Sequence, residues 1–82
     1  MARYIFNMAS RPPVEMDLPS VVVAKCEAVR YLGRMVCDEA AHFWESGELS
    51  LMVSDDKGLL LFTMDMIGRD APALRIEMPQ RT

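Results

Sequence analysis

The sequence contains a single histidine, His42, which is the first candidate for acid–base chemistry. Asp38 lies four residues before it and Glu39 three residues before it, so the three side chains would be neighbours on a helix. A histidine beside a carboxylate can act as a general base. A polar helix face exposed to water has the same pattern. We favour that interpretation because most polar stripes on helices are simply solvent-exposed faces.

Two cysteines, Cys26 and Cys37, could supply a nucleophile or metal ligands. Along a helix they would be separated by about 16 Å, which is too far for a disulfide within it. Cys37 and His42 would point about 140° apart, so they do not form a Cys–His pair. Zinc usually takes about three or four protein ligands, and this sequence does not group that many. We therefore expect buried reduced thiols, no metal, no cofactor and no enzymatic activity.

The sequence also lacks signals for other kinds of binding. The glycines are isolated from one another, so the sequence has no phosphate-binding loop or dinucleotide motif. The net charge is −3 with both signs interleaved, which predicts no basic face and no direct contact with nucleic acid. No segment approaches the run of about 18 apolar residues that suggests a membrane span, and the N-terminus lacks the apolar run of a signal peptide. We expect a cytoplasmic protein without membrane association.

The composition indicates one folded domain over residues 1–82. Hydrophobic residues make up 51% of the 82-residue chain, too many for a disordered one. A domain this small buries only about 60% of the surface that its unfolded chain exposes. Its apolar surface therefore exceeds what one small core hides, and self-association is an ordinary outlet for the excess.

The element that would position the candidate side chains is one long helix over residues 20–45. Ser20 is the expected N-cap, with Asp17 as the alternative, and Gly47 suits the left-handed position after the last turn. Gly33 lies within the apolar stripe, which predicts that the helix packs closely on a sheet there, with a kink at Gly33 as the alternative. At about 100° per residue, Leu32 and Cys37 widen the stripe expected to face the sheet, which contains Val22, Cys26, Val29, Gly33, Val36, Ala40 and Phe43.

Alternating apolar and polar residues predict strands over residues 3–8, 48–54 and 59–66. The last two are joined by a tight turn, Asp55–Gly58, in which Gly58 suits a positive φ. Residues 14–17 could add a short edge strand. The sheet face expected to lie under the helix carries Tyr4, Phe6, Met8, Leu49, Leu51, Val53, Leu60, Phe62 and Met64.

These elements predict an α+β fold. A single long helix would pack on one face of a small three- to four-stranded sheet, in the order β-α-β-β with a possible further strand. Residues 1–66 would form the compact core. Residues 67–82 would form a fourth strand around Leu74–Met78 or a frayed tail.

Three short motifs also resemble a known family: Arg3–Asn7, Leu18-Pro19-Ser20 and Val53–Gly58. Together with Ala24, Glu27 and Ala28, they are similar to a family of small stand-alone bacterial domains of unknown function. Its members open with an Arg-Tyr-aromatic-Phe-Asp strand, continue with a Leu-Pro-Asp helix start and a long helix, and end in a hairpin. The resemblance covers residues 1–66 and implies the fold and a bacterial origin, but no activity.

This chain departs from that family pattern at three places. Asn7 and Ser20 stand where the family usually has Asp, and Ser10–Pro13 replaces a longer acidic turn. Any function of the family's acidic positions is therefore in doubt for this chain.

Apolar residues outside the expected core predict an interaction surface. A helix of residues 20–45 would be about 39 Å long, whereas the strands would span about 20–27 Å, so the helix must kink or overhang the sheet. An overhang would expose its aromatic end, although Trp44 could instead fold back onto the strand that follows. The candidate interface contains Ile5, Val21, Ala28, Leu32, Met35, Phe43, Trp44, Met52 and Leu61.

The sequence thus favours an uncharacterised, non-enzymatic interaction module that forms a homodimer. The alternative is an antitoxin-like or adaptor domain that binds nucleic acid through a partner, for which Arg3, Arg30, Arg34 and Arg75 would have to assemble a basic patch. A third possibility is a small ligand-binding protein or enzyme, with a pocket under the helix end lined by Tyr31, His42 and Trp44.

Overall fold

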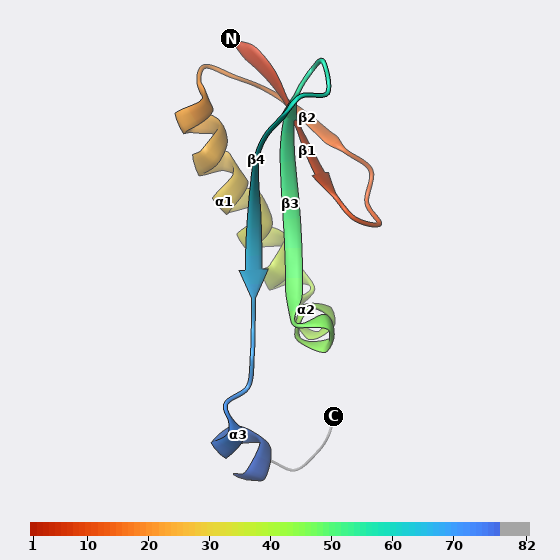
Figure 1. The fold of residues 1–82 in the computed structure, drawn as a ribbon, viewed down its shortest axis with the longest axis vertical. Helices are drawn as coiled ribbons and strands as arrows, with labels where there is room; N and C mark the ends of the chain where they lie inside the picture. The colour runs from red at the N-terminus through yellow and green to blue at the C-terminus, as the bar shows by residue number, and fades with distance from the viewer. Residues whose placement is uncertain (78–82) are drawn as a thin grey trace.

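The computed structural model describes residues 1–77, whose elements follow in the order β1, β2, α1, α2, β3, β4, α3 (Figure 1). The four strands form one antiparallel sheet in the order β2-β1-β3-β4. The strands are β1 (Ala2–Met8), β2 (Val14–Leu18), β3 (Glu48–Asp55) and β4 (Leu60–Ile67). The helices are α1 (Val21–Asp38), α2 (Ala40–Ser46) and α3 (Pro72–Glu77).

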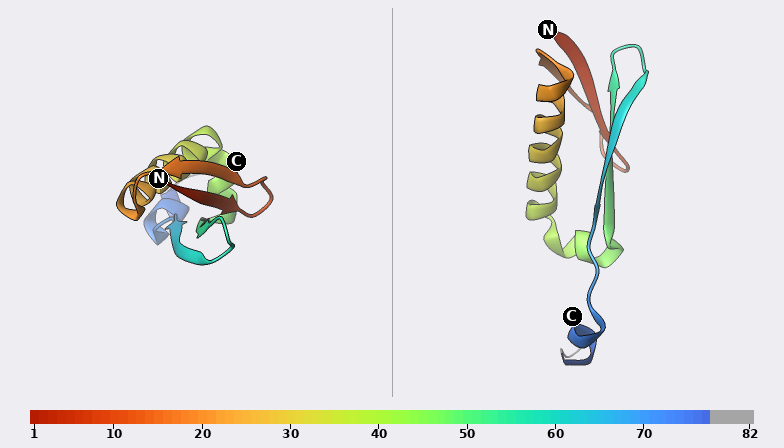
Figure 2. Two further views of the ribbon diagram at one scale, coloured as in Figure 1. Left: turned by 90° about the horizontal axis from the view of Figure 1, so that it is seen from above. Right: turned by 60° about the vertical axis from the view of Figure 1, so that its left-hand side comes forward.

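The α+β class and the placement of a helix on one face of the sheet are confirmed. Figure 2 shows α1 lying along one face, while no other element of residues 1–77 covers the opposite face. The predicted order of elements is wrong, because two strands rather than one precede the helix. The additional strand is β2, at the position where residues 14–17 were expected to form a short edge strand.

The possible strand around Leu74–Met78 is wrong for the part that the structure describes. Residues Pro72–Glu77 form α3 instead, and Met78 lies outside the described residues. Pro72 is the first residue of this helix, where its fixed φ suits a helix and its missing N–H costs nothing. Three alternating apolar residues were too short a pattern to outweigh that start signal.

The single helix predicted over residues 20–45 is divided into α1 and α2. The break lies at Glu39, which has φ −125° and ψ 45°, and not at Gly33. A continuous helix would have run past the end of the sheet, whereas the break lets α2 turn across that end (Figure 2). Phe43 is buried as a result. The burial of this aromatic ring is a stabilising gain that a straight helix would have forgone.

The predicted helix caps and turn are confirmed. Ser20 accepts a hydrogen bond from the amide of Val23 at 3.2 Å, which satisfies one of the free N–H groups at the start of α1. Gly47 ends α2 with φ 79°, and its amide donates to the carbonyl of Phe43 at 2.8 Å. Gly58 has φ 90° in the turn between β3 and β4.

The side of α1 that faces the sheet differs from the predicted stripe. Ala24, Ala28 and Leu32 are completely buried, whereas Val22 is 73% and Val29 is 58% exposed. The two alanines are small, so they let the helix approach the sheet closely. A Cβ at Gly33 would have no atom within 4 Å, so the prediction of close packing at Gly33 is wrong.

The thiols lie on the outside of the same helix. Cys26 and Cys37 are both exposed, so the expectation of buried thiols is wrong. The expectation of buried thiols followed from the predicted apolar stripe, and the structure shows that a different side of α1 faces the sheet.

The core lies between α1 and the sheet. Of the sheet residues predicted to be covered, Leu60 is the exception, being 53% exposed. The register between β3 and β4 shifts at Val53/Ser54, so Leu60 pairs with Ser54 and does not continue the inward alternation of Phe62. The others are buried or half-buried: Tyr4, Phe6, Met8, Leu49, Leu51, Val53, Phe62 and Met64.

Candidate functional site

The candidate interface residues on α1 separate into two groups. Ala28 and Leu32 are completely buried, and Met35 is half-buried against the core. The assignment of Ala28 and Leu32 to a surface open to a partner is therefore wrong, because they lie on the side of the helix that faces the sheet. Val21 is exposed at the start of α1.

The candidate residues on the sheet remain accessible. Met52 and Leu61 are exposed, and Ile5 is half-buried. Met52 on β3 pairs with Asn7 of β1 and Thr63 of β4, so it lies at the centre of the sheet. The face opposite α1 therefore has an apolar centre surrounded by polar side chains.

The aromatic residues of α2 pack on the chain that leaves the sheet. The rings of Phe43 and Trp44 meet edge to face, with centroids 5.5 Å apart. A Cβ at Gly68 would lie 2.7 Å from Trp44 and 2.9 Å from Phe43, so the two rings lie directly against the backbone there. Trp44 is still about half exposed. It therefore neither overhangs freely nor folds back onto the start of β3.

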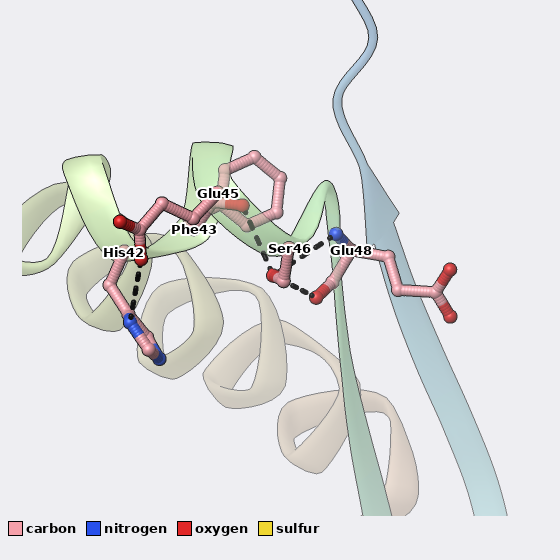
Figure 3. Close-up of polar contacts among 5 residues, drawn as sticks. All are labelled: His42, Phe43, Glu45, Ser46 and Glu48. Carbon is pink, nitrogen blue, oxygen red and sulfur yellow. Dashed lines mark hydrogen bonds and ion pairs between the residues drawn. The ribbon is translucent and has the colours of Figure 1, made fainter. Parts of the chain in front are cut away.

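A serine joins α2 to β3 (Figure 3). The Ser46 hydroxyl lies 3.2 Å from the carbonyl oxygen of Phe43 and 3.1 Å from that of Glu48, and it accepts from the Glu48 amide at 3.5 Å. These contacts use backbone groups at the end of the helix and the start of the strand. Ser46 thus fixes the corner at which α2 enters the sheet.

His42 lies beside a carboxylate other than the two considered from the sequence. Its Nδ1 is 3.7 Å from a carboxylate oxygen of Glu45 (Figure 3), and both side chains are 80% exposed. The break at Glu39 moves His42 onto a separate helix from Asp38. An exposed pair of this kind is dominated by its interaction with water.

A cavity of about 280 Å³ lies where α1, α2 and the turn between β1 and β2 meet. Met35, Val36 and Phe43 are among its apolar lining residues, and Arg11 and Glu39 form an ion pair at its edge. The lining includes His42 but neither Tyr31 nor Trp44, so the predicted pocket has a different composition. Its volume is at the lower end of the range for small-molecule sites.

The ion pair at the cavity shifts the protonation of both partners. The hydrogen bond from Arg11 lowers the pKa of the Glu39 carboxyl, although desolvation opposes the shift. The same hydrogen bond raises the pKa of Arg11. The pair joins the turn after β1 to the break between the helices. Sequence reasoning missed it because the two residues are far apart in the chain and neither belongs to a motif.

Two of the four arginines proposed for a basic patch, Arg3 and Arg30, have acidic neighbours. Arg3 lies 3.3 Å from Asp17 and 3.4 Å from Glu15. Arg30 lies 3.1 Å from Glu27 on the same helix. These pairs neutralise much of the positive charge that a nucleic-acid surface would need.

The described part of the chain lacks two further features. Among residues 1–77, no group of three or more His, Cys, Asp or Glu side chains is placed to hold a metal ion. Within the same part of the chain, no helix has the length and apolar character to cross a membrane.

The fold and the surfaces above define a small α+β domain with one helix-covered and one open sheet face. Residues 3–68 match the family described as Domain of unknown function (DUF6894), and the chain belongs to this family. The resemblance to a domain of unknown function is thereby confirmed, over nearly the expected range. Neither a curated protein nor a solved structure matches the chain.

Proposed function

We propose that this chain is a non-enzymatic interaction module that associates with itself as a homodimer. The observation that carries the proposal is strand β4, an edge strand of eight residues with apolar side chains in the open. Leu60 is 53% and Ile67 is 56% exposed on it. A long, apolar edge strand is a site at which another chain can pair.

The size of the domain favours the same conclusion. Burying one Leu, Ile or Met side chain completely stabilises a protein by about 1.5–3 kcal/mol. A small domain has a correspondingly small core, so a few such side chains at a dimer contact add a large fraction of its stability. The exposed residues Leu60 and Ile67 of β4, Leu59 just before it and Met52 on the open face are available for this.

A cytoplasmic, bacterial setting belongs to the same proposal. Cys26 and Cys37 are free and exposed, and free thiols persist in reducing compartments. The bacterial origin follows from the family resemblance given by the sequence motifs.

Light scattering after size exclusion at micromolar concentration tests the proposal. We expect twice the 9.3 kDa mass of one chain, decreasing toward 9.3 kDa on dilution. A mass of 9.3 kDa at every concentration would refute self-association.

The alternative, a domain that binds nucleic acid through a partner, makes a different prediction. It requires DNA or RNA binding that weakens as salt is raised. The acidic neighbours of Arg3 and Arg30 count against it. Failure to bind either nucleic acid at any salt concentration would exclude direct contact.

A further inference from the structure

The two edges of the sheet are built differently. Strand β2 has five residues, and its outward residues Glu15 and Asp17 form ion pairs with Arg3 of the neighbouring strand. It is also flanked by Pro12-Pro13 and Pro19. Short length, charge and flanking prolines are the features by which proteins protect an edge from pairing. Strand β4 has eight residues, no proline, no lysine and one charged residue, Asp65.

The backbone groups that β4 leaves open can be assigned from its pairing. The amide of Gly68 donates to the carbonyl of Gly47 at 2.9 Å, in the same register as the rest of the β3–β4 ladder. In an antiparallel pair, alternate residues direct their N–H and C=O groups to the same neighbour. Those of Met64 and Met66 therefore point toward β3. The groups of Thr63, Asp65 and Ile67 point to the open edge.

The helix-facing side of β4 is also only partly covered. Phe62, Met64 and Met66 are half-buried there, whereas Val53 and Leu51, the partners of Phe62 and Met64 on β3, are completely buried. A shallow cavity of about 280 Å³ lies between this strand and α1. Its lining residues are Lys25, Val29, Phe62, Thr63 and Met64.

A second copy matches both features. A two-fold axis perpendicular to the sheet makes two β4 strands antiparallel, keeps both α1 helices on one face, and places one residue opposite itself. With Met64 at the axis, Thr63 lies opposite Asp65 of the other copy. Placing Asp65 at the axis would instead oppose two like charges, which is destabilising. The half-buried side chains Phe62, Met64 and Met66 of both copies would then lie between the two helices.

The chain after β4 leaves the compact part of the molecule. Residues 68–77 continue beyond the end of the sheet, and α3 stands clear of α1 (Figures 1 and 2). The molecule is 51 Å long and 22 Å wide, and its radius of gyration is 15.6 Å. A compact chain of this length would have a radius of gyration of about 12 Å.

We propose that two copies pair through the open edges of β4 into one eight-stranded sheet. The four-stranded sheet of each copy contributes its β4 edge to this contact. This inference rests on the proposed homodimer, and it names the surface. The Met52 side chain on the open face then takes no part in the contact.

A proline at position 63 tests the edge directly. The amide of Thr63 points away from β3, so Thr63→Pro removes an edge donor and leaves the chain's own ladder in place, as edge strands allow. We expect Thr63→Pro to be monomeric and Thr63→Val, which keeps the amide, to remain dimeric. Met52→Lys, on the open face, should also remain dimeric. A dimer that survives Thr63→Pro but not Met52→Lys would overturn the edge assignment while leaving the homodimer proposal intact.

Amide exchange measured by NMR covers the case in which Thr63→Pro does not fold. In the unmodified chain, we expect the amides of Thr63, Asp65 and Ile67 to exchange at least about tenfold more slowly at a dimer-forming concentration than on dilution. The amide of Met64 should be protected at both concentrations. Fast exchange at the three edge amides in a dimeric sample would overturn the inference, whereas a monomeric sample throughout would overturn the proposed function itself.

Discussion

Gly33 provides the sharpest test of how α1 lies on the sheet. The residue is within the helix, it does not have a positive φ, and a Cβ added there would meet no atom within 4 Å. The change Gly33→Ala therefore introduces no clash and no backbone strain.

The expected effect of Gly33→Ala is stabilising. Glycine in a helix interior is about 0.8–1.0 kcal/mol less favourable than alanine, largely because its unfolded chain has more conformational freedom to lose. No opposing cost arises from packing, because the space around the new methyl group is open. We expect an increase of about 1 kcal/mol in the free energy of unfolding, and for a domain of 60–100 residues this raises the Tm by about 4–8 °C.

Thermal and urea unfolding followed by circular dichroism measure this effect. Both proteins must be compared at the same concentration, because association raises the Tm by mass action. An unchanged urea m-value would show that the change acts on stability alone. A decrease in the Tm of Gly33→Ala would refute the reasoning and would mean that α1 approaches the sheet at Gly33 after all.

Three further changes follow from the same structure. Gly68→Ala should cost about 1–3 kcal/mol as an overpacked site, and it should change the fluorescence of the single tryptophan, Trp44. Leu32→Ala should lower the free energy of unfolding by about 2–5 kcal/mol, because Leu32 is completely buried. Because Arg11 lowers the pKa of Glu39, their pairing stabilises the fold above the unfolded pKa of about 4.3, and this contribution is lost as the pH falls through the lower folded value.

Two of these changes have a matched control variant, and the third has a result that would contradict it. Val29→Ala, on the exposed side of α1, should change stability by less than about 0.5 kcal/mol, and a loss equal to that of Leu32→Ala would contradict the helix phase. Glu39→Gln should unfold in acid with a weaker pH dependence than the unmodified chain. Unchanged Trp44 fluorescence and stability in Gly68→Ala would show that the two aromatic rings move aside without cost.

The sequence was sufficient for local signals and insufficient for the phase of the helix. Ser20, Gly47 and Gly58 act through their own backbone and neighbours, so their roles as cap and turn residues could be predicted. The side of α1 that faces the sheet could not be predicted, because valine contributes more than alanine to the hydrophobicity of a stripe. In the structure the sheet favours the small residues Ala24 and Ala28, which permit a close approach.

The break at Glu39 and the exposed residues of α1 could not be predicted, because both depend on contacts between residues that are far apart in the chain. No glycine or proline marks the break, and Glu39 gains its partner Arg11 from the turn after β1. The same wrong phase placed Ala28 and Leu32 on the candidate interface. The sheet residue Met52 was placed correctly on the open face, because alternation along a strand depends only on the period of two.

The two thiols on α1 have a consequence for handling the protein. Cys26 and Cys37 are free and exposed, and eleven helical positions bring them to within about 20° of the same side of the helix. They are too far apart to close on each other within one helix, so an oxidising buffer would join them between molecules. With two such points on each chain, oxidation produces open covalent chains of many lengths. A reducing agent, or replacement of both cysteines by serine, separates that chemical polymer from the reversible association of folded domains.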